Sequence, residues 1–295
     1  MPKPKSMSVS ILRNVFHPSD FSPASEVAFA HALKAALIAK ADLTILHVSS
    51  DQGANWMDFP GVRSTLERWG LLPKNSPRAA VLKLGINVKK IVAKHSNPVR
   101  SVLTYLNTHT TDLIVLATDQ HAGRVRWLDK SVAEPVARKS RQMTLFIPKG
   151  VDGFVSAGDG SVSLKSILIP VASSPPAQPA IQAAARIVYR LNSPTGLFTI
   201  LHVGEEEEMP TVGCPQLTGW QWKKTTRKGE VINVILQTAR EISADLIVMS
   251  TDGRNGFLDA LRGTHSERVL HGSPCPLLAV PTSGFVASAL QAESD

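Results

Sequence analysis

The chain repeats itself, and this repeat limits its fold more than any other feature of the sequence. Four segments of the first half return in the second half in the same order. The opening that ends at Asp20 matches the one that ends at Ala172, and "LTILHV" (43–48) matches "FTILHV" (198–203). Further along, "TDLIVLATD" (111–119) matches "ADLIVMSTD" (244–252), and "QMTLFIP" (142–148) matches "PCPLLAVP" (274–281). A period of about 150 residues indicates domain duplication rather than a solenoid.

Each half is predicted to alternate strands and helices. The repeated segments are short, continuously apolar and rich in β-branched residues, as in strands that are buried on both faces of a parallel sheet. A helix is expected after the first strand, because Ser22 can cap it, Pro23 fits its first position and apolar residues follow with helical spacing. Strand, helix and strand in this order imply right-handed crossovers and a doubly wound α/β sheet. The expected boundaries are a first domain at 1–150, a linker with a hairpin at 151–163, a second domain at 164–283 and a tail at 284–295.

The halves differ between their second repeated strand and the "DLIV" strand. The first half has roughly twenty more residues there, and 61–72 within them predict an extra helix. The second half crosses the same span with a polar, proline-broken stretch that cannot form a long helix. Its "GWQW" alternation predicts a strand that carries Trp220 and Trp222 on one face.

The loop after the last "DLIV" strand carries two glycines, at 253 and 263, whose places in the first half hold other residues. Open α/β sheets bind ligands at the carboxyl ends of their strands. Gly253 and Gly263 allow the backbone to approach a ligand closely or to adopt a positive φ. Thr264, with Glu267 three residues later, has the form of a capping box, so a helix with free amides for an anion is expected just after Gly263.

The earlier copy of this loop keeps the capping pair and loses the glycines. Gln120 and Lys130 stand at the glycine positions, followed by Ser131 and Glu134. Pro135 removes a further amide from the first turn of the expected helix. Close backbone approach to an anion is therefore not expected in the first half.

On these residues the chain resembles a tandem universal stress protein, in which two such domains are fused. The resemblance implies two doubly wound, parallel-sheet domains of the Rossmann-like, adenine nucleotide alpha hydrolase-like type, packed as a pseudo-dimer through antiparallel last strands. Nucleotide-binding members carry Gly, two residues, Gly, nine residues, Gly, then Ser or Thr, and an Asp that ends the first strand. The second half departs from this pattern at the first glycine, where Ser250 stands, and at the Asp, where Ala172 stands. The first half keeps the Asp as Asp20.

The resemblance implies a site for ATP or another adenine nucleotide, with or without magnesium, in the second domain. Its candidate residues are Ser250, Gly253, Arg254, Gly263, Thr264 and His265. Only a vestigial site is expected in the first domain, at Asp20 and Ser131. No Walker motif, nucleophile elbow or paired-carboxylate signature is present, so no catalytic residue is assigned. Enzymatic activity is expected to be absent, or to be at most slow ATP hydrolysis or autophosphorylation.

Composition and charge limit the kinds of partner and the cellular location that are expected for the chain. No apolar run reaches the roughly 20 residues that cross a bilayer, and "MPKPKSMSVS" lacks the apolar core of an export signal. A cytoplasmic location is therefore expected, with Cys214 and Cys275 as reduced thiols. The net charge is +8, but the basic residues are scattered along the sequence, which favours a solvated surface over a nucleic-acid partner. We also expect no membrane partner, whereas a homodimer and specific protein partners stay open.

Several residues have a structural interpretation beside a functional one. His47 and His202 lie within apolar strands and are expected to be core histidines, each with a hydrogen bond. Cys214, Cys275, His265 and His271 include no pair with the close Cys-x-x-Cys or His-x-x-x-His spacing of metal ligands, so no metal site is expected. Asp20 can cap its own turn, and Gly253 and Gly263 can be turn glycines only.

Two functions follow from these alternatives. In the first, the second half binds an adenine nucleotide, and binding orders the loop between Asp252 and Gly263 as a regulatory signal. In the second, the chain is a stress-response interaction scaffold that binds no nucleotide. The two glycines, Thr264 and Arg254 favour the first function. The absent glycines of one half and the absent Asp of the other favour the second.

Overall fold

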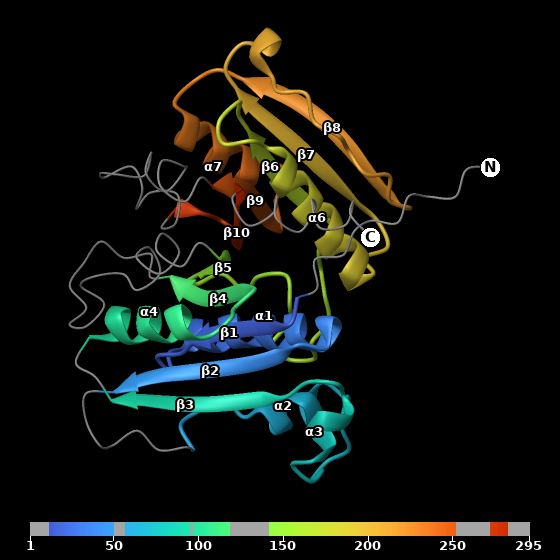
Figure 1. The fold of residues 1–295 in the computed structure, drawn as a ribbon. Coiled ribbons are helices and arrows are strands. Elements are labelled where there is room, and N and C mark those ends of the chain that lie inside the picture. Colours follow the sequence, from blue (N-terminus) through green and yellow to red (C-terminus); the bar gives the residue numbers. More distant parts are fainter. Residues whose placement is uncertain (1–11, 50–56, 95–96, 119–141, 252–271, 283–295) are drawn as a thin grey trace, which may run out of the picture.

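A ten-stranded sheet runs through both halves of the chain (Figure 1). The computed structural model describes residues 12–49, 57–94, 97–118, 142–251 and 272–282. Its strands are β1 (Asn14–Pro18), β2 (Asp42–Ser49), β3 (Val88–Lys94), β4 (Leu113–Thr118), β5 (Met143–Pro148), β6 (Ser166–Val171), β7 (Gly196–Val203), β8 (Trp220–Arg227), β9 (Leu246–Thr251) and β10 (Leu277–Pro281). Its helices are α1 (Pro23–Ala39), α2 (Val62–Arg68), α3 (Ala80–Lys83), α4 (Pro98–Thr108), α6 (Gln178–Leu191) and α7 (Val231–Glu241), with a 3-10 turn η1 (Glu206–Glu208).

The strand order shows the duplication directly. It runs β3-β2-β1-β4-β5-β10-β9-β6-β7-β8, so the second half repeats the internal order of the first in reverse across the sheet. All the paired strands are parallel except β5 and β10, which are antiparallel with Leu278 opposite Leu145. The predicted doubly wound α/β fold and the pairing through the last strands are both confirmed.

Equivalent aspartates hold the first strand of each half in the same way. A carboxylate oxygen of Asp112 accepts hydrogen bonds from two amides at the start of β1, both at 2.8 Å. Asp245 accepts from the two equivalent amides at the start of β6, at 2.7 and 2.8 Å. Because these bonds tie the "DLIV" strand to the first strand of each half, they set the register between neighbours that are far apart in the sequence.

The predicted local elements are present. α1 starts at Pro23, and the Ser22 hydroxyl accepts a hydrogen bond from the amide of Ser25 at 3.2 Å, so the predicted cap is confirmed. The extra helix of the first half forms as α2, and the equivalent stretch of the second half holds only the short turn η1. Trp220 and Trp222 lie on one face of β8, since both rings pack against Phe198.

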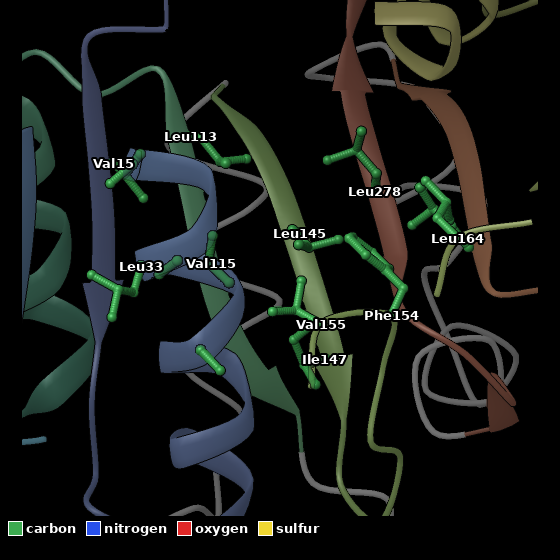
Figure 2. Close-up of a cluster of buried hydrophobic side chains, with 14 of the residues drawn as sticks. Val15, Leu33, Leu113, Val115, Leu145, Ile147, Phe154, Val155, Leu164 and Leu278 are labelled. Atoms are coloured by element: carbon green, nitrogen blue, oxygen red, sulfur yellow. The ribbon is translucent and has the colours of Figure 1, made fainter. Parts of the chain in front are cut away.

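Helices cover both faces of the sheet. Buried residues of α1 and α6 belong to one hydrophobic cluster, which extends across both halves, and those of α4 and α7 belong to the cluster on the opposite face. Figure 2 shows the first cluster where the halves meet, with Phe154 and Val155 beside Leu145 and Ile147 of β5. One continuous core therefore joins the two halves.

The segment between the halves forms a small hairpin that docks on the first half. Val155 and Val162 make an isolated antiparallel bridge. The carbonyl of Ala157 accepts hydrogen bonds from the Arg68 guanidinium at 3.0 and 3.2 Å and from the Trp69 indole at 3.1 Å. Because Arg68 ends α2 and Trp69 follows it, the helix that only the first half possesses holds the connection between the halves.

His31 of α1 also holds the segment between the halves in place, through hydrogen bonds of its ring. Its Nδ1 lies 2.9 Å from the carbonyl of Val27, and its Nε2 accepts from the amides of Phe154 and Val155, both at 3.2 Å. An Nε2 that accepts two hydrogen bonds carries no proton, and burial lowers the pKa of His31 to about 4. The connection therefore depends on a neutral imidazole.

No helix of the described residues is long and apolar enough to span a bilayer.

Candidate functional site

In each half the strand order changes direction at the first strand, β1 or β6. At such a switch point a ligand site is expected. In the first half β1 pairs with β2 on one side and β4 on the other, yet β1 and β4 pair only at Val15–Leu113 and Phe16–Ile114. β6 and β9 likewise pair at only two positions near their starts. The strands therefore separate toward their carboxyl ends, which is where doubly wound sheets bind ligands.

In the first half, Asp20 closes its own turn. Its Oδ1 accepts a hydrogen bond from the amide of Ser22 at 3.0 Å, and Ser22 in turn caps α1. Phe21 between them has a φ of 62°, a conformation that side-chain-bearing residues rarely adopt. The described contacts of Asp20 thus give it the capping role that its sequence also allowed.

Aromatic side chains fill the space beside this turn. The Phe21 ring stacks on the His47 imidazole with centroids 3.9 Å apart, and Phe59 meets Phe21 edge-on at 5.1 Å. His47 Nδ1 lies 2.8 Å from the carbonyl of Ser19. The first half therefore covers the carboxyl ends of β1 and β2 with its own side chains.

A buried polar chain lies under the same turn. His17 Nδ1 is 2.8 Å from the carbonyl of Val115, and its Nε2 is 3.5 Å from the hydroxyl of Ser25, which is 3.1 Å from that of Ser19. Burial lowers the pKa of His17 to about 4, so the ring is neutral at physiological pH. The second half has Ile169, Val171 and Ala177 at these three positions.

In the second half the equivalent histidine, His202, has a similar position, but one of its ring nitrogens has no hydrogen-bond partner among the described residues. His202 Nδ1 lies 3.3 Å from the carbonyl of Val171, the residue equivalent to Ser19. Its Nε2 is buried and has no hydrogen-bond partner among the described residues. The residue equivalent to Phe21 is Ser173, and it is exposed together with Ala172. Within the described part of the chain, the second half therefore lacks the aromatic cover of the first and keeps an unsatisfied acceptor on the equivalent histidine.

Ser250 lies at the carboxyl end of β9, as its sequence position predicts. It is buried, and its hydroxyl accepts a hydrogen bond from the amide of Ala180 at 3.3 Å. This contact ties the end of β9 to the first turn of α6. Because a hydroxyl oxygen has two lone pairs and a proton, Ser250 keeps hydrogen-bonding capacity beyond this contact.

The loop after β7 is fastened to the start of α6. The Gln178 side chain makes two hydrogen bonds with Gly213, accepting from its amide at 2.8 Å and donating to its carbonyl at 2.9 Å. Sequence reasoning missed this contact, because Gln178 and Gly213 are 35 residues apart and neither stands in a motif. Phe21 was missed as well, since nothing local indicates that a phenylalanine takes a left-handed conformation.

The remaining predicted site residues lie outside the described residues: Gly253, Arg254, Gly263, Thr264 and His265 of the second half and Ser131 of the first. Among the described residues, no cluster of three or more His, Cys, Asp or Glu side chains could hold a metal ion. Cys275 is buried, and burial raises the pKa of its thiol to about 12. The structure thus places Ser250, with the start of α6, and His202 at the carboxyl ends of the two strands that flank β6. In the first half, Asp20, Phe21 and His47 lie at the carboxyl ends of β1 and β2.

Two doubly wound sheets joined through their last strands, with one switch point each, define a tandem α/β protein. The model of the universal stress protein family matches residues 12–148 and 214–281. The chain therefore belongs to the universal stress protein family.

Individual relatives agree with this assignment. A universal stress protein from Synechocystis is 28% identical over 139 residues, which cover 41% of this chain and 88% of that protein. The crystal structure of a universal stress protein from Archaeoglobus fulgidus covers 91% of this chain and 98% of its own, with a TM-score of 0.58 and 19% identity. A putative universal stress protein from Pseudomonas aeruginosa covers 96% of this chain and 98% of its own, with a TM-score of 0.55 and 12% identity. Both structures match the fold over both halves.

Proposed function

We propose that this universal stress protein is a cytoplasmic regulator that binds one adenine nucleotide, at the switch point of its second domain. The observation that carries the proposal is the difference between two equivalent histidines. His47 is covered by Phe21, whereas the equivalent of Phe21 in the second half is the exposed Ser173, and His202 keeps a buried Nε2 without a hydrogen-bond partner among the described residues.

A nucleotide matches what the second switch point lacks. A buried acceptor without a partner costs on the order of 1–3 kcal/mol, so a ligand that donates a hydrogen bond to it is favoured. A nucleotide carries such donors in its amino and hydroxyl groups. It also carries an aromatic base. In the first half, an aromatic ring, that of Phe21, stacks on the equivalent histidine, His47. The glycine loop of residues 253–263 and Thr264 follow β9 directly and supply amides for the phosphates.

Magnesium enters this proposal only with the nucleotide. The carboxylate that ends the first strand of nucleotide-binding family members is Ala172 here, so the second half offers no carboxylate at that position. Hard oxygen ligands are what magnesium prefers, and nucleotide phosphates provide them. ATP is therefore expected to bind with or without magnesium, with a modest difference in affinity.

Calorimetry on nucleotide-stripped protein tests the proposal. Dissociation constants for ATP, ADP and AMP are measured together with the number of sites per chain, and one site is expected. Ser173→Phe places the aromatic cover of the first half in the second and is expected to abolish binding. Phe21→Ser, the reciprocal change, is the control and is expected to leave affinity unchanged. Two sites per chain, or loss of binding in Phe21→Ser alone, would place the nucleotide in the first half.

The alternative is a scaffold that binds no nucleotide. Two observations favour it: the first switch point is closed by its own side chains, and Ala172 replaces the family's carboxylate in the second. This alternative predicts no heat of binding with any of the three nucleotides. It also predicts that Ser173→Phe changes nothing except the local packing.

A further inference from the structure

We propose that the outer end of the first domain docks on membrane surfaces that are rich in anionic lipid. This end is formed by α2, α3, the edge strand β3 and the segments between them (Figure 1). The inference is independent of nucleotide binding, which concerns the opposite half of the molecule.

Nearly all of the net charge of the chain lies in this one segment. Residues 61–94 hold eight lysines and arginines and a single glutamate, a net charge of +7 against +8 for the whole chain. The glutamate, Glu67, is already engaged, by Arg63 at 3.7 Å and by the amide of Ser76 at 3.1 Å. The expectation of no membrane partner rested on the charge of the whole chain, not on that of this segment. The fold brings Arg78, which precedes α3, close to Lys90 of β3.

The basic end consists of Lys74, Arg78, Lys83, Lys89, Lys90 and Lys94. All are exposed except Lys90, which is half-buried over the ring of Phe59. Burial lowers the pKa of the Lys90 amine, and repulsion from the nearby Arg78 lowers it further. Within the described part of the chain, none of the six forms an ion pair. Like charges without partners favour an anionic surface from outside.

The second domain provides an internal comparison. The stretch from the end of β7 to the end of β8, residues 204–228, holds four acidic and four basic residues, so its net charge is zero. The equivalent stretch of the first half, residues 50–94, holds eight basic and three acidic residues, a net charge of +5. The cations of the second-half stretch are partly neutralised by the fold, since Lys228 pairs with Glu205 at 2.6 Å and Arg227 with Glu241 at 2.6 Å. Lysines on an edge strand discourage pairing with another sheet, and that accounts for those of β3 and β8 alike. It does not account for Lys74, Arg78 and Lys83, which lie before and within α3.

Exposed aliphatic side chains accompany the basic end. Of the five large hydrophobic residues exposed in the described residues, three lie here: Met57 before α2 at 86%, Leu71 after α2 at 43% and Leu82 within α3 at 59%. Basic residues beside aliphatic ones are typical of surfaces that lie at the membrane interface. A surface for single-stranded nucleic acid would present aromatic rings for stacking, but the rings that the structure describes here, Phe59 and Trp69, are buried. The combination therefore favours a lipid surface.

Vesicle sedimentation tests the proposal on the full chain. Binding is compared between vesicles of phosphatidylcholine alone and vesicles with about one third phosphatidylglycerol, at about 0.1 M and about 0.5 M salt. Binding is expected only with the anionic lipid and is expected to weaken at high salt. The variant Lys74→Glu/Arg78→Glu/Lys83→Glu should bind roughly 100-fold more weakly. The matched control Lys223→Glu/Lys224→Glu/Lys228→Glu changes the net charge equally on the second domain and should bind as the native chain does.

A leucine variant separates lipid from nucleic acid. Leu71→Ser/Leu82→Ser is expected to weaken vesicle binding about 10-fold. Circular dichroism and thermal unfolding confirm that each variant is folded, which the exposure of all the changed residues favours. Absence of vesicle binding by the native chain would overturn the proposal. Tighter binding to duplex DNA or RNA, unaffected by the leucine variant, would also overturn it and assign the basic end to nucleic acid.

Discussion

The ring of Phe21 lies on the imidazole of His47, with centroids 3.9 Å apart and planes 15° from parallel. In the second half the equivalent residues are Ser173 and His202, and no ring of the described residues stacks on this imidazole. Gene duplication gave both halves the same strands and the same histidine. They differ in whether their own side chains occupy the switch point.

Substitutions at Phe21 separate its packing from its backbone strain. Phe21→Ala loses the stacking but keeps a side chain at a φ of 62°, so we expect the free energy of unfolding to fall by about 1–3 kcal/mol. Phe21→Gly removes more atoms, yet it should be the milder change by about 1 kcal/mol, because glycine adopts this φ without strain. Urea unfolding of both variants checks this. Greater stability of Phe21→Ala than of Phe21→Gly would show that the backbone is not strained.

Stability is expected to fall as the pH drops from 6.5 toward 4. Burial lowers the pKa of His17 and of His31 to about 4 from the ordinary histidine value of 6.5. The folded state therefore binds fewer protons than the unfolded state within this window, so each ring contributes stability above pH 6.5 that is lost as the pH falls through it. The size is on the order of 3 kcal/mol per ring.

The variant His17→Ile tests this dependence. It copies the residue of the second half, Ile169, and removes one of the two titrating groups. Its free energy of unfolding should change less between pH 7 and pH 4.5 than that of the native chain. Parallel pH profiles for the two proteins would show that His17 is not neutral in the folded state.

The hairpin between the halves is held by a close contact of Gly160 with Trp69. A Cβ at Gly160 would lie 2.5 Å from Cδ2 of the indole, whereas one at Gly150 would meet nothing within 4 Å. Both glycines have a positive φ, 70° and 81°, so the strain of an alanine is common to them. Gly160→Ala should therefore be more destabilising than Gly150→Ala by about 1–3 kcal/mol, measured by urea unfolding. Equal losses would mean that the hairpin moves away from Trp69 without cost.

Much of the fold could be predicted from the sequence because its signals are local or repeated. Ser22 and Pro23 mark the start of α1, and the repeated apolar segments mark the strands. The burial of His47 and His202 followed from their place within such segments. The contacts that distinguish the halves could not be predicted. The stacking of Phe21 on His47 joins residues that no motif links, and the docking of Ala157 on Trp69 spans 88 residues.

The role of Gly263 can be separated into ligand binding and turn geometry. If its backbone approaches a phosphate, Gly263→Ala should weaken ATP binding by about 10- to 150-fold, through the loss of a charge-assisted hydrogen bond worth about 1.5–3 kcal/mol. If it serves only a turn with positive φ, stability falls by about 1 kcal/mol or more with or without ligand. Calorimetry and urea unfolding on the same protein decide between the two. Affinity within a factor of about two of the native value, together with lower stability, favours the scaffold.

Exchange of the loop residues between the halves tests the central claim most directly. The measurement is the dissociation constant of ATP, by calorimetry on nucleotide-stripped protein, for two double variants. Gly253→Gln/Gly263→Lys gives the second half the residues of the first and should abolish binding, whereas Gln120→Ala/Lys130→Ala should leave the constant unchanged. Binding that survives the first variant and is lost in the second would contradict the assignment of the nucleotide to the second domain.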